Sequence, residues 1–330
     1  MKTISLLFIG VIAFLACNRK NVETRTIFFS KEYSRTDDSL YVGYIGDFCV
    51  VGDTVYMTDN YNSIVYKLLP NHKLFNIFPY QKGKGPGELL GPSGIEIYKD
   101  TIFIETSGSK INYYTKELSY LGYYKLKRRH YGDTFIFDNK GNIHYQIHSK
   151  SAALIRENRF TKEIFKYGKP VIHKGKINVY RSMYLLTNNN GKNIIAVRET
   201  LPEIVFFDFN GNPLKKINIS NLPCLRNTLI AIEEWDRKNK SVTSYSVLFR
   251  HALIKRGFLY LSYYDHSTNT SNYILKFKIE NLDLRFVEKI ILQTNDKYTS
   301  FSSFGITNDN RLITFDNINK KLIEFQIDAL

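Results

Sequence analysis

Apolar and polar side chains alternate in short runs along most of the chain, and turns of Gly, Asn and Asp separate these runs. The clearest run follows such a turn six times: GDTVYMTDN from Gly52, KDTIFIETS from Lys99, GNIHYQIHS from Gly141, GKNIIAVRE from Gly191, GFLYLSYYD from Gly257 and NRLITFDN from Asn310. Alternation with a period of two predicts β-strands, and Gly, Asn and Asp tolerate the positive φ of tight hairpin turns. The pattern predicts six related hairpins.

A third strand follows each hairpin, at residues 63–68, 110–115, 152–158, 203–209, 271–279 and 321–327. Further turn residues and a fourth strand complete most units, which recur at roughly 40 to 65 residues. Four antiparallel strands in each repeat are typical of a β-propeller blade. We therefore predict an all-β fold, a six-bladed β-propeller with four-stranded antiparallel blades over residues 24–330.

The ends of the chain suggest how such a ring closes. The last unit contains only three strands before Leu330, whereas the strand TRTIFFS at residues 24–30 belongs to no unit. We expect this N-terminal strand to serve as the outer strand of the last blade, because that removes an exposed sheet edge. The alternative all-β fold, two sandwiches, explains neither the sixfold repeat nor the missing strand.

One segment has helical spacing instead. In CLRNTLIAIEEWDRKNK, residues 224–240, the apolar residues Leu225, Leu229, Ile232 and Trp235 fall on one helical face. This predicts a short helix inserted between the fourth and fifth units. The helix could pack over one rim of the ring, or form a lid or a partner surface.

The N-terminus predicts export. Residues 1–16, MKTISLLFIGVIAFLA, place a lysine before an apolar run too short to span a bilayer, which is the pattern of a signal peptide. The letters FLAC resemble a bacterial lipobox, although Phe14 departs from the usual aliphatic residue. We expect lipidation at Cys17, residues 17–23 as anchor and linker, and an outer-membrane lipoprotein that faces the periplasm or the surface. The alternative is an ordinary signal peptide with a coincidental cysteine.

The net charge indicates which classes of partner the protein could bind. The formal net charge is +15, which favours anionic partners such as acidic glycans, peptides or lipid headgroups. Export argues against nucleic acid as a partner, and the spread of Lys and Arg along the chain leaves an ordinary basic surface as the alternative.

Only Cys49 and Cys224 remain besides Cys17, and two cysteines are too few for a disulfide framework. We expect a monomeric propeller.

A glycine-rich segment, QKGKGPGELLGPSG at residues 81–94, raises the question of phosphate binding. A Walker-type loop needs Gly-Lys-Ser/Thr and a helix directly after it, but here the following residues, GIEIYKDTIFIE, predict a pair of strands. We expect this segment to connect the first two blades, with Gly supplying positive φ and Glu88 holding loop amides.

The same segment carries a family resemblance. GKGPGELLGPSGIEI resembles the Gly-x-Gly-Pro-Gly-Glu segment of six-bladed, TolB-like or NHL-like propeller lipoproteins of Bacteroidota-type bacteria, where it also precedes the inner strand of an early blade. The match is specific over residues 81–98 and architectural elsewhere. It implies an envelope propeller of largely uncharacterised function.

No motif identifies a reaction. Metal-ligand spacings and the Gly-x-Ser-x-Gly elbow are absent from the sequence, and no cofactor is expected. A metal-dependent, lactonase-like envelope hydrolase would need acids that converge on the ring axis. The acidic residues at the starts of inner strands are Asp47, Glu96 and Asp133. Because only three blades supply one, we expect a binding module rather than an enzyme, with the hydrolase as the alternative.

One face of the ring carries the candidate ligand contacts. Loops on this face hold Asp59, Asn60 and Tyr61, and cations mixed with aromatic residues. The binding candidates are Lys82, Lys84, Glu88, Arg128, Arg129, Tyr180, Arg181 and Tyr264. Cations can bind carboxylates or phosphates, while rings cover sugar or peptide faces. The sequence therefore favours a recognition or scaffold module for an anionic glycan or a peptide.

Overall fold

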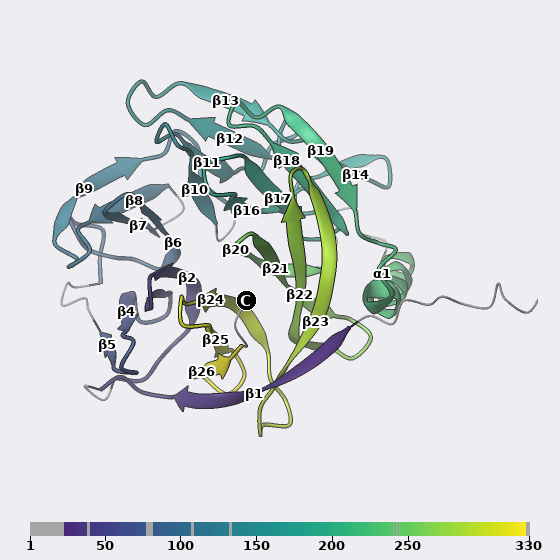
Figure 1. The fold of residues 1–330 in the computed structure, drawn as a ribbon. Helices are drawn as coiled ribbons and strands as arrows, with labels where there is room; N and C mark the ends of the chain where they lie inside the picture. Colours follow the sequence, from purple (N-terminus) through teal and green to yellow (C-terminus); the bar gives the residue numbers. More distant parts are fainter. Residues whose placement is uncertain are drawn as a thin grey trace, which may run out of the picture.

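β-Strands make up most of the chain in the computed structural model, which describes residues 23–37, 40–76, 82–106, 109–131, 134–239, 241, 243 and 245–327. They form six four-stranded antiparallel blades arranged in a ring (Figure 1). This confirms the predicted fold class. The predicted signal peptide and Cys17 lie outside the described residues.

Each blade runs from an inner strand at the axis to an outer strand. The first three blades are β2 (Ile45–Val51), β3 (Thr54–Asp59), β4 (Ile64–Leu68) and β5 (Leu74–Asn76); β6 (Pro92–Tyr98), β7 (Thr101–Thr106), β8 (Lys110–Tyr114) and β9 (Tyr120–Lys125); and β10 (Phe135–Phe137), β11 (Ile143–Gln146), β12 (Leu154–Glu157) and β13 (Ile164–Tyr167). The last three are β16 (Tyr184–Asn188), β17 (Ile194–Arg198), β18 (Glu203–Phe207) and β19 (Pro213–Asn218); β20 (Phe249–Lys255), β21 (Phe258–Asp265), β22 (Thr270–Glu280) and β23 (Asp283–Gln293); and β24 (Phe301–Ile306), β25 (Arg311–Asp316), β26 (Lys321–Gln326) and β1 (Thr24–Tyr33).

The core lies between the blades. Each inner strand contacts the inner strands of its two neighbours, and β2 and β24 complete the circle. Buried side chains of the described residues form six hydrophobic clusters, one at each interface between neighbouring blades. On β3, Val55 and Met57 pack toward blade six, whereas Tyr56 packs toward blade two. Both faces of a blade are therefore buried, and this explains why the second strands are almost continuously apolar.

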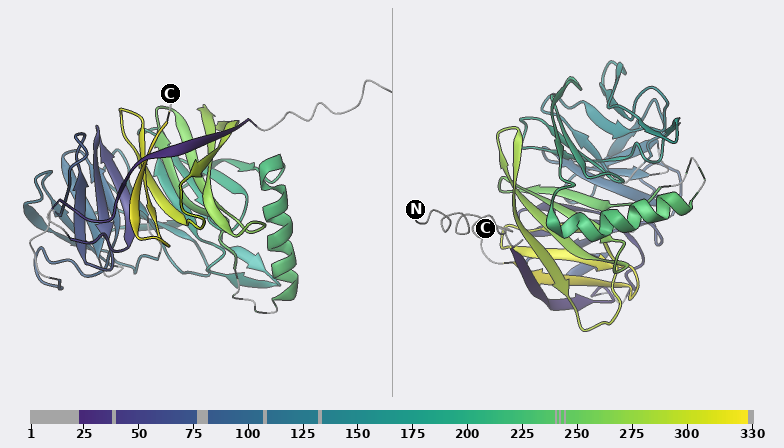
Figure 2. Two further views of the ribbon diagram at one scale, coloured as in Figure 1. Left: turned by 90° about the horizontal axis from the view of Figure 1, so that it is seen from below. Right: turned by 90° about the vertical axis from the view of Figure 1, so that its right-hand side faces the viewer.

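The strand β1 closes the ring in two parts. Residues 24–28 pair in parallel with β23 of blade five, and residues 29–33 pair antiparallel with β26 of blade six. A register shift between Phe29 and Lys31 separates the two parts. Blades five and six thereby share one eight-stranded sheet. The predicted closure by the N-terminal strand is confirmed, but only the second half of β1 is the outer strand of blade six (Figures 1 and 2).

Tight turns join the first and second strands as predicted. Gly52 and Gly257 adopt φ of 62° and 77°, and Lys99 adopts a φ of 56° at the corresponding turn of blade two. These turns lie on the back face of the ring. The front face carries the connections between second and third strands and those that lead into each inner strand.

Two insertions depart from the blade pattern. The predicted helix is present as α1 (Arg226–Lys238), preceded by the short 3-10 helix η2 (Pro223–Leu225), and it lies along one side of the ring (Figure 2). A hairpin that the sequence analysis did not predict, β14 (Val171–His173) and β15 (Lys176–Asn178), joins blades three and four. The Lys174 ammonium donates to main-chain carbonyls at the end of α1, so the two insertions support each other. In the described part of the chain, no helix has the length and apolar character needed to cross a membrane.

Candidate functional site

The glycine-rich loop before β6 folds around one carboxylate. The Gly85 amide donates to Glu88 Oε2 at 2.7 Å, and a Cβ atom added at Gly85 would lie 2.9 Å from this carboxylate. Lys110 Nζ donates to the Gly85 carbonyl at 3.0 Å. The Glu88 carboxylate therefore lies inside the loop and stabilises its conformation, while Lys82 and Lys84 are exposed on the front face. The residues after this loop form β6, a strand, as the sequence analysis expected.

An aromatic row crosses the front face over blades three to five. It consists of Tyr131, His148, Tyr180 and Tyr245, which come from four different connections. The rings of Tyr131 and His148 stack with centroids 3.9 Å apart. His148 meets Tyr180 edge to face at 4.9 Å, and Tyr180 stacks on Tyr245 at 5.5 Å. Each ring thus supports the next, which holds a line of partly exposed aromatic surface in place.

Cations flank one end of the aromatic row. A pocket of about 260 Å³ there is lined by Arg128, Arg129, Tyr131, Ile147, His148, Ser149 and Lys166. The described lining includes three cations and no acid. The Arg129 guanidinium lies 5.2 Å from the centroid of the Tyr131 ring. Burial, and then the nearby charge of Arg129, lower the pKa of His148, so that its ring is neutral at pH 7. The pocket therefore carries a positive charge that does not depend on His148.

Two other predicted contacts are engaged inside the protein. Arg181 is only 5% exposed, and its guanidinium pairs with Asp236 of α1. The Tyr264 ring is partly buried; its hydroxyl donates to Asn269 and its face lies 5.0 Å from the Arg250 guanidinium. Arg181 thus anchors the helix from beneath the front face, whereas Arg128, Arg129 and Tyr180 present accessible surface.

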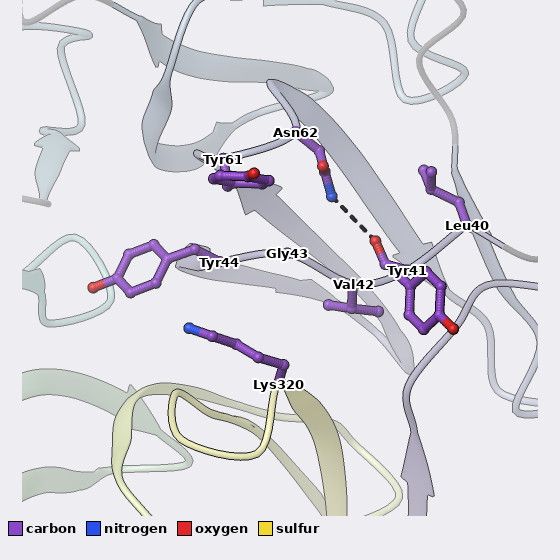
Figure 3. Close-up of a pocket in the computed structure, with 8 residues that line it drawn as sticks. All are labelled: Leu40, Tyr41, Val42, Gly43, Tyr44, Tyr61, Asn62 and Lys320. Atoms are coloured by element: carbon purple, nitrogen blue, oxygen red, sulfur yellow. Dashed lines mark hydrogen bonds between the residues drawn. The ribbon is translucent and has the colours of Figure 1, made fainter.

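A second pocket, the tyrosine cleft, lies between blades one and six (Figure 3). Its volume is about 630 Å³, and it is lined by Leu40, Tyr41, Val42, Gly43, Tyr44, Tyr61, Asn62 and Lys320. The loop that leads into β2 supplies Leu40 to Tyr44, the turn after β3 supplies Tyr61 and Asn62, and the turn after β25 supplies Lys320.

Asp59 at the end of β3 holds the cleft together. Its carboxylate accepts the amides of Gly43 at 2.7 Å, Tyr44 at 3.1 Å and Asn62 at 2.9 Å. The Asn62 side chain in turn donates to the Tyr41 carbonyl at 3.1 Å (Figure 3). A Cβ atom at Gly43 would lie 2.6 Å from the Asp59 carboxylate, so glycine is required at this position.

Sequence reasoning placed Tyr61 on this face but missed Tyr41, Tyr44 and Lys320. A signal was available in the repeated Asp-Asn-x-Asn of residues 59–62 and 316–319. Asn319 donates to the Asp316 carboxylate and to the Tyr298 carbonyl, as Asn62 does to Asp59 and the Tyr41 carbonyl. The motif marks turns that fix an incoming loop on the front face.

The candidate metal ligands Asp47 and Glu96 line a third space, a channel of about 470 Å³ along the ring axis. Asp47 Oδ1 lies 3.4 Å from His251 Nε2, and its other oxygen accepts the Ile95 amide at 3.1 Å. Burial, and then the Asp47 charge, raise the pKa of Glu96 to about 8. Asp133 lies outside the described residues. Among those described, no three His, Cys, Asp or Glu residues lie together in a way that could hold a metal ion.

Neither remaining cysteine is in a disulfide. Cys49 and Cys224 are both free, and Cys49 lies beside the axial channel. Burial raises the pKa of the Cys49 thiol, with the nearby carboxylate of Glu96 adding to the effect. A protonated thiol is a poor nucleophile, which favours a structural role for Cys49.

Similar architectures occur in exported and enzymatic propellers. A protein of Bacteroides fragilis that is described as exported is 14% identical, with a TM-score of 0.57 over 93% of this chain and 99% of its own. Virginiamycin B lyase from Staphylococcus aureus is 12% identical, with a TM-score of 0.50 over 91% and 89% of the two chains. A gluconolactonase from Xanthomonas campestris is 10% identical, with a TM-score of 0.53 over 89% and 87%. No model of a known protein family and no curated protein matches the sequence. At these identities the structural matches establish that the chain has the β-propeller fold.

Proposed function

We propose that this protein is a recognition module of the bacterial cell envelope, related to the TolB-like or NHL-like propeller lipoproteins. In this proposal a lipid on Cys17 tethers it to the outer membrane, and its monomeric propeller binds an anionic glycan on the front face. The similarity to an exported propeller supports the compartment.

The aromatic row and its flanking cations are the observation that carries the proposal. Stacked rings form a line of rigid apolar surface, and aromatic faces attract the polarised C–H groups of sugar rings. Arg128, Arg129 and Lys166 stand beside this line with no acidic residue in the described lining. An acidic polysaccharide presents flat rings and anionic groups in alternation, so it matches both features.

A glycan fits this surface better than a peptide does. An extended peptide can bind by adding a strand to an exposed sheet edge, but the aromatic row is built from loops and presents side chains. Neighbouring rings of the row cover part of each other's faces, so sugar units would contact the exposed ring edges and the uncovered faces of this shallow surface. Binding would be salt-dependent because the guanidinium groups are exposed.

Calorimetric titration of hexagalacturonate, with maltohexaose as the neutral counterpart, tests the proposal. We expect the acidic hexasaccharide to bind and the neutral one to bind at least tenfold more weakly. Arg129→Ala and Lys166→Ala should each weaken binding by roughly three- to tenfold, as expected for one charge-assisted contact. Tyr180→Ala should weaken binding to a similar extent through the lost ring face.

The matched control is Lys192→Ala. Lys192 is exposed in the turn between β16 and β17 on the back face, so its loss changes the net charge equally without touching the aromatic row. Equal effects of the Lys192 and Lys166 substitutions would indicate non-specific charge attraction and contradict the proposal. Absence of binding by hexagalacturonate and by a sulfated hexasaccharide, or tighter binding of hexaglutamate, would also contradict it.

A further inference from the structure

The tyrosine cleft has a different chemistry from the aromatic row and lies in another part of the front face. We propose that the cleft is a second binding site, which takes a small organic monocarboxylate with a flat apolar body, such as an aryl carboxylate. The proposal goes beyond glycan recognition, because the cleft shares no residue with the row or with its cationic pocket.

The polar main-chain groups of the cleft are largely used inside the protein. Asp59 accepts the Gly43 and Tyr44 amides, and the Tyr41 carbonyl accepts both the Asn62 side chain and the Tyr66 hydroxyl, each at 3.1 Å. The Val42 amide donates to the Ser34 carbonyl, and the Tyr44 carbonyl accepts the Asn60 amide. A ligand with many hydroxyl or amide groups would therefore find few partners here, and buried polar groups without partners weaken binding.

One charged side chain lines this apolar surface, while the Arg35 guanidinium lies outside the lining and covers the Tyr41 ring, 3.9 Å from its centroid. Lys320 is the only charged side chain among the described residues that line the cleft. Within the described part of the chain its ammonium has neither an ion pair nor a hydrogen bond. The ammonium nitrogen lies 5.7 Å from the centroid of the Tyr44 ring and 6.0 Å from that of the Phe315 ring. Figure 3 shows the Lys320 side chain extending toward Tyr44. A single ammonium beside aromatic rings suits a ligand with one carboxylate.

The cleft offers its rings to solvent rather than to the core. Tyr41, Tyr44 and Tyr61 are 60%, 43% and 76% exposed. The Asp59 hydrogen bonds fix the backbone from which Tyr44 projects. Flat rings exposed around Val42 and Leu40 favour a flat apolar body, which can stack on one ring and contact the aliphatic groups.

Three classes of carboxylate ligand differ in the binding partners that they need in the cleft. A uronic acid has a carboxylate but also several hydroxyls that need partners. A peptide that ends in an apolar residue has a carboxylate and main-chain amides that need partners. An aryl carboxylate needs only the Lys320 ammonium and one exposed ring, such as that of Tyr61.

The probe is 3-phenylpropionate, with 3-phenylpropionamide as the uncharged analogue, titrated by ligand-observed NMR and calorimetry against the full chain. We expect the acid to bind about tenfold more tightly than the amide. Lys320→Met should lower the affinity for the acid about tenfold and leave the affinity for the amide unchanged. Tyr61→Ala should weaken both ligands about three- to tenfold, and Tyr61→Phe should retain binding.

Lys99→Met is the matched control. Lys99 is exposed, has a φ of 56° against 55° for Lys320, and lies 5.4 Å from the Tyr98 ring, but it sits on the back face. This variant should bind 3-phenylpropionate like the wild type, and so should Arg129→Ala, which separates failure of this site from failure of the aromatic row. An unaltered affinity in Lys320→Met at unchanged melting temperature would overturn the proposal. Tighter binding of glucuronate, or of a short peptide ending in phenylalanine, would also overturn it.

Discussion

The protonation of Glu96 is coupled to the folding of the ring. It is partly buried in the axial channel, and burial together with the Asp47 charge raises its pKa to about 8, from an ordinary value of 4.5. The folded protein therefore prefers a protonated Glu96, whereas the unfolded chain loses this proton near its ordinary pKa. Stability that depends on Glu96 is present below about pH 4.5, declines as the pH rises toward 8, and stays low at higher pH.

The predicted fall in stability with rising pH can be tested by substituting Glu96. Glu96→Gln keeps the shape and cannot ionise, so the variant should lose less stability between pH 5 and pH 9 than the wild type does. The expected difference is roughly 1 to 3 kcal/mol, because Glu96 is only partly buried and its exposed part reduces the full effect of the pKa shift. Denaturant unfolding at the two pH values measures it. The exposed Glu234→Gln should behave like the wild type, and parallel pH profiles for wild type and Glu96→Gln would show that Glu96 titrates normally.

At the scale of elements, β1 determines whether the ring is closed. Its first half covers the edge of β23 and its second half completes blade six, so it links the first residues of the propeller to its last two blades. Charge pairs reinforce both halves: Arg25 with Glu288, and Lys321 with Glu32. The Lys321–Glu32 pair is partly exposed and contributes little by itself, and the buried Glu288 already pairs with Lys276 without Arg25. Closure should therefore depend on the apolar contacts of β1.

Two adjacent residues of β1 test that dependence. Ile27 is 7% exposed and packs in the cluster between blades five and six, whereas Phe28 is 70% exposed. Ile27→Ala should destabilise the protein by about 2 to 4 kcal/mol through the lost burial and the cavity. Phe28→Ala should change stability by less than about 0.5 kcal/mol. Thermal and denaturant unfolding measure both. Similar small effects for the two variants would mean that β1 is not part of the cooperative fold.

At the scale of the whole molecule, the fold could be predicted from the sequence because the same hairpin pattern recurs along the chain. Six similar hairpins, each following a turn of Gly, Asn or Asp, indicate six blades without any knowledge of long-range contacts. The sites do not repeat. Tyr44, Tyr61 and Lys320 meet only because ring closure brings the first and last blades together, and no local pattern encodes that distance. The buried pairing of Arg181 with Asp236 likewise depends on where α1 packs.

The proposed attachment to the membrane involves the whole molecule, and two forces could produce it. A lipid on Cys17 would hold the protein by hydrophobic insertion, whereas the net charge of +15 could hold it to anionic headgroups. Salt distinguishes them, because about 1 M salt shortens the range of exposed charges to roughly 3 Å. We expect the wild type and Cys49→Ala to remain in the membrane fraction after such a wash, and Cys17→Ala to be released. Immunoblots of the fractions measure this. Release of the wild type by salt would instead assign the attachment to charge, and retention of Cys17→Ala would rule out Cys17 as the anchor.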